Sequence, residues 1–292
     1  MSKYDYIIAD VRLRSNRDIV KMGIRSFAPF ASLHTDGVAD CTLSFVTIIE
    51  HVEPIKRLSE SYIAETDAES SLYSTASGYL YTITRRCDSS KSYTLHIDNT
   101  TKIITTDINP KSNIDLAILR FGIWVMFGVV LAENNAIAMH SSTIVADERA
   151  VLFLGESGTG KSTHTRLWRE SIEGAILLND DSPIVRIVDG EVRVYGSPWS
   201  GKTPCYKNEY YPIAGFCRLT QAPHNRIKRL LPLMAIGALL PSCPPIFAHD
   251  EHLQDLICST IGKVLSSVGV FSLECLPNTE AAELSYNTIL RG

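Results

Sequence analysis

One short glycine-rich segment constrains the fold of this chain more than any other feature. Residues Gly155–Ser162 read G-E-S-G-T-G-K-S, which fits the pattern G-x-x-x-x-G-K-[ST] at every defined position. The apolar run Ala150–Leu154 precedes it and predicts a strand, and Ser162–Glu170 is expected to be a helix. Backbone N–H groups at such a turn converge on phosphate oxygens at the positive end of the helix. The segment therefore predicts a phosphate-binding loop in an α/β fold.

Each residue type in this segment has a chemical reason to be there. Lys161 supplies a mobile positive charge for β- and γ-phosphates, and Ser162 offers a hydroxyl to Mg²⁺. The alternative is a glycine-rich turn without a ligand, which the completeness of the motif disfavours. The expected nucleotide-binding residues are Gly155, Glu156, Ser157, Gly158, Thr159, Gly160, Lys161, Ser162 and Thr163.

A second anchor for Mg²⁺ is expected at the end of a neighbouring strand. The short apolar run Ala175–Leu178 is followed by Asn179-Asp180-Asp181, as in a Walker B element. We expect Asp181 to hold the metal with Ser162 and Asp180 to accept a proton as the catalytic base, although the two aspartates can exchange roles. The alternative is a simple turn before Ser182-Pro183.

Together these residues resemble the HPr kinase/phosphorylase family, whose core resembles that of phosphoenolpyruvate carboxykinase. The loop G-E-S-G-T-G-K-S-T is similar to the G-x-S-G-x-G-K-[ST] form of both families, and Asp180-Asp181 follows on the next strand. Met139-His140 precedes the loop strand, where HPr kinases carry a Met-His pair. The resemblance covers about 136–229. It implies a P-loop core with a mixed sheet, in which His140 stabilises charge or assists proton movement; the alternative is a structural histidine.

Two further segments supply candidate site residues. The family signature L-E-I-R-G-x-G is absent, and a segment broken by glycine and proline, 194–202, stands in roughly its place. Ser197, Trp199 and Lys202 of this segment are expected to form a loop over the substrate, or alternatively a structural turn with Trp199 in the core. From the basic segment 221–231, Arg226 is the choice for a catalytic contact with the transferring phosphoryl group, with a surface loop as the alternative.

The first 112 residues predict a smaller β-rich domain, and residues 113–292 a P-loop kinase-like domain. Val, Ile, Thr and Tyr are frequent in the predicted strands, whereas the polar segment Glu65–Ser77 predicts a loop. A core helix is expected from Asn113 to about Asn134, followed by one strand over Ala136–Val145. The predicted strands of the first domain are Tyr6–Leu13, Thr42–Ile49, Gly78–Thr84, Ser92–Asp98 and Lys102–Ile108.

Composition narrows the functional class without defining the chemistry. The 28 basic and 32 acidic residues give a net charge of −4, which disfavours a nucleic-acid partner. The 7 cysteines include no C-x-x-C pair, so neither a disulfide framework nor a zinc ribbon is indicated. The apolar stretch Phe121–Ala132 is shorter than the roughly 20 residues of a membrane span. We expect a cytoplasmic protein with no membrane partner, and the resemblance implies a homo-oligomer.

The sequence as a whole predicts an ATP-dependent phosphotransferase that uses Mg²⁺. The acceptor is expected to be a hydroxyl, such as a serine of a protein, a peptide or a small molecule. GTP and pyrophosphate are alternatives to ATP as the donor. The alternative functions are a nucleotide-binding sensor or scaffold without catalysis, and a P-loop NTPase.

Overall fold

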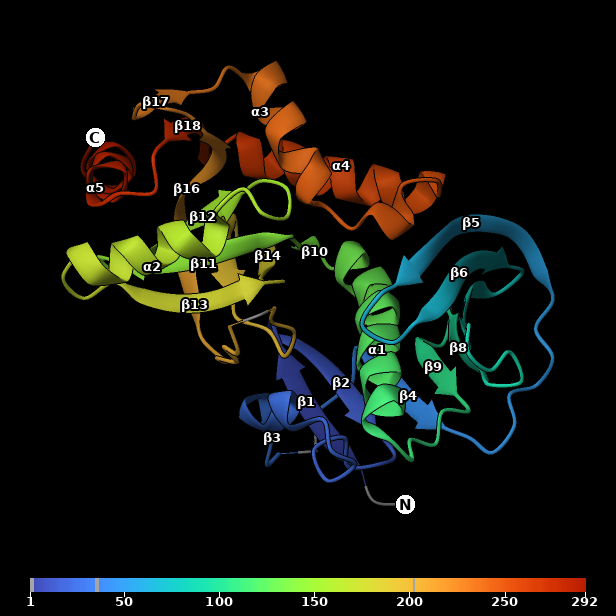
Figure 1. Cartoon of the computed structure of the whole chain (residues 1–292). Helices are drawn as coiled ribbons and strands as arrows, with labels where there is room; N and C mark the ends of the chain where they lie inside the picture. Colours follow the sequence, from blue (N-terminus) through green and yellow to red (C-terminus); the bar gives the residue numbers. More distant parts are fainter. Residues whose placement is uncertain (1–2, 35–36, 202) are drawn as a thin grey trace. The chain divides into compact units, whose positions relative to one another are not determined.

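A computed structural model describes residues 3–34, 37–201 and 203–292 of the chain (Figure 1). By its internal contacts the chain divides into two compact units. The first comprises Met1–Asn134 with Pro245–Asp255, and the second comprises Asn135–Pro244 with Leu256–Gly292. The predicted boundary between residues 112 and 113 falls one helix earlier, because helix α1 (Asn113–Glu133) packs on strands of the first unit.

The described residues of the first unit form one sheet of nine strands, in the order β3-β1-β2-β4-β9-β8-β7-β6-β5. The strands from β5 to β9 form antiparallel neighbours, whereas β4 is parallel to both β2 and β9. The strands are β1 (Tyr4–Ile8), β2 (Val11–Ser15), β3 (Ala31–Ser32), β4 (Cys41–Phe45), β5 (Pro54–Ile63), β6 (Ala68–Thr75), β7 (Gly78–Arg85), β8 (Ser92–Asp98) and β9 (Ile103–Thr106). A 3-10 helix spans Arg25–Phe30.

The predicted loop over Glu65–Ser77 is wrong, because most of it is strand β6. Its residues alternate between buried Ala68, Ser70 and Leu72 and more exposed neighbours, which is the period of a half-buried strand. The alternate positions are Glu69, Ser71, Tyr73 and Thr75, so the segment reads as polar although it pairs with β5 and β7. Because the segment contains few apolar residues, the alternation of buried and exposed positions could not be recognised from its sequence.

Helix α1 confirms the helix predicted from Asn113. Ser112 caps it, since its hydroxyl accepts the backbone N–H of Asp115 at 3.2 Å. The helix packs on β7 and β8, where Leu95 occupies the space that a side chain at Gly122 would need. By length and composition alone α1 could cross a membrane, but 61% of its most apolar window is buried. This burial is the pattern of a core helix.

The second unit is built on a mixed sheet, in agreement with the α/β prediction. Its strand order is β10-β14-β15-β16-β12-β11-β13, with β18 beside β16 and β17 beside β18. Strand β16 is parallel to β12 and β18, and its other partner, β15, is antiparallel. The strands are β10 (Ala136–Ala138), β11 (Ser141–Ala146), β12 (Arg149–Leu154), β13 (Ile176–Asp181), β14 (Ile184–Val188), β15 (Glu191–Tyr195), β16 (Tyr210–Gln221), β17 (Arg226–Arg229) and β18 (Gly269–Cys275).

Helices α2 (Lys161–Ser171) and α5 (Thr279–Tyr286) pack on each other in this unit. Trp168 of α2 is fully buried, and its indole N–H donates to the Ser285 hydroxyl of α5 at 2.9 Å. His164 of α2 lies 3.0 Å from the same hydroxyl. This unit also contains α3 (Pro232–Leu239), a 3-10 turn at Leu240–Ser242 and a π-helix at Asn287–Arg291. The 3-10 turn at Pro245–Phe247 belongs to the first unit, and α4 (Glu251–Leu265) has residues in both units. The shared hydroxyl fixes α2, which begins at the glycine-rich loop.

Burial of His164 makes the stability of this unit pH-dependent. Desolvation lowers the pKa of His164 to about 4, whereas an unfolded chain titrates near 6.5. Between these values the unfolded chain binds a proton that the folded protein does not, so stability falls as pH drops through this window, by about 3 kcal/mol in all. Denaturant unfolding at about pH 7 and about pH 4.5 should show this loss. The His164→Gln variant should lose less stability on acidification; an equal loss in both proteins would contradict the assignment.

Candidate nucleotide-binding and phosphoryl-transfer site

The glycine-rich loop connects β12 to α2, as the sequence predicts. Gly155, Gly158 and Gly160 have φ of 145°, 86° and 103°, a region of backbone space that favours glycine. No atom lies within 4 Å of a side chain built at Gly158 or Gly160, so conformation and not crowding requires glycine there. Helix α2 begins at Lys161. We call Gly155–Gly160 the glycine loop.

The ammonium group of Lys161 folds back over this loop. Its Nζ donates to the backbone oxygens of Gly155 and Glu156 at 2.7 and 3.1 Å, and lies 3.0 Å from Nε2 of His140. Lys161 is only 9% exposed. Burial lowers the pKa of its ammonium group, and the negative charges of Asp181 and Asp180 act in the opposite direction. The positive charge is thus held beside the loop and toward the two aspartates.

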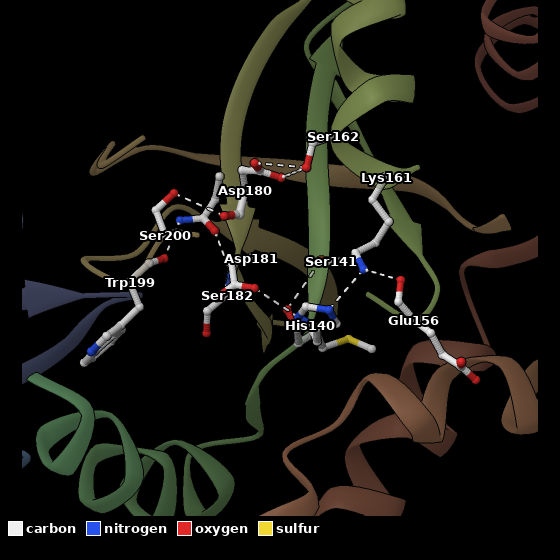
Figure 2. Close-up of polar contacts among 12 residues, drawn as sticks. His140, Ser141, Glu156, Lys161, Ser162, Asp180, Asp181, Ser182, Trp199 and Ser200 are labelled. Carbon is white, nitrogen blue, oxygen red and sulfur yellow. Dashed lines mark hydrogen bonds and ion pairs between the residues drawn. The ribbon is translucent and has the colours of Figure 1, made fainter. Parts of the chain in front are cut away.

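Ser162 and Asp180 form a pair that suits a magnesium ion. The Ser162 hydroxyl lies 3.0 and 3.2 Å from the two carboxylate oxygens of Asp180 (Figure 2). Asp180 is 5% exposed and lies near the end of β13, beside β11. Among the described residues no cluster of three or more His, Cys, Asp or Glu side chains could hold a metal by itself. One carboxylate and one hydroxyl nevertheless fit Mg²⁺, which commonly takes few protein ligands beside substrate phosphates.

Asp181 takes part in a different contact. Its Oδ1 lies 3.1 Å from Nδ1 of His140, and both side chains are about half exposed, at 45% and 46%. His140 therefore lies between Asp181 and Lys161, with one ring nitrogen toward each (Figure 2). The backbone of Asp181 has a φ of 139°, which is unusual for a residue with a side chain. An exposed carboxylate beside a histidine can accept a proton from a hydroxyl.

His140 reaches this position because the predicted strand over Ala136–Val145 is interrupted. Strand β10 ends at Ala138 and pairs with β14, whereas β11 begins at Ser141 and pairs with β12 and β13. The residues between them form other backbone bonds, and the N–H of His140 donates to the oxygen of Ser242 at 2.7 Å. The prediction of one continuous strand is wrong at this point. The interruption leaves the His140 side chain beside the glycine loop.

Asn179, which the sequence analysis did not assign a role, fixes the backbone around the two aspartates. It is fully buried. Its amide group donates to the backbone oxygen of Trp199 at 3.0 Å, and its oxygen accepts the N–H of Ser182 at 2.9 Å. The sequence feature that could have indicated this role is the position of Asn179, a polar residue between an apolar run and the Asp pair. Asn179 thus ties Asp180-Asp181 to the loop that contains Trp199.

The segment predicted to cover a substrate supports the aspartates instead. Ser197 is fully buried, and its hydroxyl donates to the backbone oxygen of Ser182 at 2.6 Å; Trp199 is 6% exposed. Gly201 and Ser200 both donate to the backbone oxygen of Asp180, at 2.6 and 3.2 Å. Ser197 and Trp199 are therefore structural in this arrangement, the alternative left open from the sequence. Lys202 lies outside the described residues.

Arg226 occupies the edge strand β17, where its register partner on β18 is Glu274. It is exposed. Among the described residues no hydrogen bond or ion pair joins Arg226 to the glycine loop, His140 or the aspartates. The predicted contact between Arg226 and a phosphoryl group remains a prediction. The contacts that the structure does bring together are those among His140, Lys161, Ser162, Asp180 and Asp181.

We predict that Asn179→Ala lowers turnover more than it lowers nucleotide affinity. Removal of the amide leaves buried backbone groups unpaired, which costs about 2–3 kcal/mol of stability. The same loss frees the backbone of Asp180 and Asp181. Steady-state kinetics should show a reduced kcat with a KM for the nucleotide within several-fold of the wild type. The matched control is Asn287→Ala, at an exposed position; equal kinetics for both variants would contradict a positioning role for Asn179.

Comparison with known proteins finds a likeness among solved structures. No family model and no curated protein matches the chain. Among solved structures, the chain is similar to the Hpr(Ser) kinase/phosphatase from Coxiella burnetii, at 12% identity and a TM-score of 0.29. The likeness covers 52% of this chain and 92% of that chain. At this score it carries no argument about activity, which rests on the residues of the site.

Proposed function

We propose that this chain is an ATP-dependent phosphotransferase that moves a phosphoryl group to a hydroxyl. The observation that carries the proposal is the joint arrangement of Lys161 at the glycine loop, Ser162 on Asp180, and His140 between Lys161 and Asp181. A phosphate loop alone would suit a sensor. A second, more exposed carboxylate paired with a histidine adds a group for proton transfer.

In this proposal the binding roles divide between the loop and β13. The N–H groups of the glycine loop and the Lys161 ammonium hold the phosphates of ATP. Ser162 and Asp180 would hold Mg²⁺, since their oxygens are within hydrogen-bond distance of each other. When bound, Mg²⁺ neutralises charge on the β- and γ-phosphates. This assignment gives Asp180 the metal role that the sequence analysis first gave to Asp181.

Asp181 is the proposed base, with His140 as the residue that orients it. The acceptor oxygen forms a bond to the γ-phosphorus, the bond from that phosphorus to the bridging oxygen breaks, and ADP leaves. Asp181 takes the proton of the acceptor hydroxyl. His140 lies between Asp181 and Lys161 and holds the Asp181 carboxylate in place through its contact with Oδ1. The acceptor class is a serine of a protein, a peptide or a small molecule.

Product analysis with γ-labelled ATP tests this proposal against its alternatives. The protein is incubated with Mg²⁺ and a panel of serine, serine-containing peptides and small hydroxylated metabolites. Label on an acceptor supports the phosphotransferase. Release of free phosphate alone would favour an NTPase, and unchanged ATP with measurable nucleotide binding would favour a sensor.

A further inference from the structure

A pocket of about 560 Å³ lies directly beside the glycine loop. Its lining comes from the loop, from the first turns of α2, from the end of β16 and the residues that follow it, and from the end of β18 and the segment that leads to α5. The proposed reacting residues His140, Asp180 and Asp181 are not part of this lining. The lining residues are Gly158, Thr159, Gly160, Thr163, His164, Leu167, Leu219, Gln221, Ala222, Pro223, Cys275, Leu276 and Pro277. The pocket is therefore separate from the place where an acceptor would react.

The pocket is continuous with the backbone that would hold phosphates. Gly158, Thr159 and Gly160 belong to both, and Thr163 lies on the first turn of α2. The side-chain amide of Gln221 donates to the backbone oxygen of Gly158 at 3.2 Å, which joins the end of β16 to the loop. If a ligand binds with its phosphates on the loop N–H groups, the end of the ligand away from the phosphates would therefore lie in this pocket.

The chemistry of the lining suits a flat, uncharged ring. Leucine, proline and alanine side chains contribute much of it, and no Asp, Glu, Lys or Arg lines it. Binding sites for small molecules typically have volumes of about 300–1,000 Å³, apolar walls and a few polar groups, and this pocket matches that description. Pyrophosphate has no group that would occupy such walls.

We propose that this pocket binds the base of a purine nucleoside triphosphate whose phosphates lie on the glycine loop. The donor is then a nucleoside triphosphate and not pyrophosphate, a choice that the sequence left open. The proposal rests on the proposed function, because it assumes that the loop binds phosphates. It goes further because it states that contacts in this pocket make a nucleotide bind more tightly than pyrophosphate.

The test compares the binding of ATP and pyrophosphate, each with Mg²⁺, by isothermal titration calorimetry. Ala222, which is partly buried in the lining, is replaced by tryptophan to fill the pocket. We expect Ala222→Trp to weaken ATP binding by about tenfold or more and to leave pyrophosphate binding within about twofold. The control is Ala248→Trp, at an exposed position outside the pocket.

The results separate the two proposals. Equal affinity of the wild type for ATP and pyrophosphate, unchanged in Ala222→Trp, would overturn the base pocket and leave the phosphate site intact. Absence of binding by either ligand to the wild type would overturn both proposals.

A second measurement needs no substitution in the pocket. Cys275 lines the pocket and is partly buried, whereas Cys258 on α4 is exposed. Alkylation of each thiol is followed by mass spectrometry in the wild-type protein. We expect ATP to slow modification of Cys275 several-fold while pyrophosphate leaves it unchanged, and Cys258 to react equally in all conditions. Equal protection of Cys275 by both ligands would overturn the proposal.

Discussion

Replacement of Lys161 by alanine should abolish most of the phosphoryl transfer by this protein. The Lys161 ammonium is the basic group that lies against both the glycine loop and His140. Loss of one preorganised charge at a developing phosphoryl charge costs about 10²–10³-fold in rate. The affinity for Mg²⁺-ATP should fall as well, by about tenfold or more, because the same charge faces the bound phosphates. Calorimetry and initial rates measure the two effects separately.

The matched control for this variant is Lys228→Ala. Lys228 is an exposed basic residue on β17 and does not line the pocket beside the loop. Its removal should change neither affinity nor rate by more than about twofold, because an exposed charge away from the ligand contributes little. Lys161→Ala with a normal rate and a normal affinity would contradict the whole assignment of the site.

The two aspartates should separate binding from chemistry. Asp181→Asn keeps the shape of the side chain and removes the carboxylate beside His140. We expect transfer to fall by about 10²-fold or more, the usual contribution of a general base, with Mg²⁺-ATP affinity within several-fold of the wild type. Asp180→Asn removes the partner of Ser162 and should instead weaken Mg²⁺-dependent nucleotide binding. Each variant is thus the control for the other.

The reversed pattern has a clear meaning. A rate loss at constant affinity in Asp180→Asn, with weakened magnesium-dependent binding in Asp181→Asn, would restore the assignment first made from the sequence. Unchanged rates in both variants would remove the acid–base assignment altogether. Titration of Mg²⁺ at fixed ATP distinguishes these cases, because only the metal ligand should shift the magnesium concentration needed for half-maximal activity.

Local chemistry explains why the glycine loop was predictable from the sequence. The conformations of Gly155, Gly158 and Gly160 and the apolar strand before them depend on residues close in the chain. The same holds for Asp180-Asp181 at the end of β13. Their division of roles was not predictable, because it depends on which carboxylate faces α2 and which faces His140. That difference arises from the left-handed backbone of Asp181 and from contacts with residues 197–201.

Features set by long-range pairing were harder to predict. The interruption between β10 and β11 has no glycine or proline to mark it and is determined by strands β13 and β14. The pocket beside the loop combines segments near 160, 222 and 276, which have no common motif. Asn179 was visible as a residue before the Asp pair, but its role depends on backbone groups of Ser182 and Trp199. Sequence patterns located the candidate site, and the proposed roles of its residues depend on the tertiary contacts.

The central claim is that this site transfers the γ-phosphate of ATP to a hydroxyl, and the fate of that phosphate tests it most directly. Wild-type protein and Lys161→Ala are incubated with Mg²⁺, γ-labelled ATP and the same panel of serine-bearing acceptors. We predict label on an acceptor hydroxyl with the wild type and a loss of about 10²-fold or more with the variant. Absence of labelled acceptor in both proteins, or equal labelling by both, would contradict it.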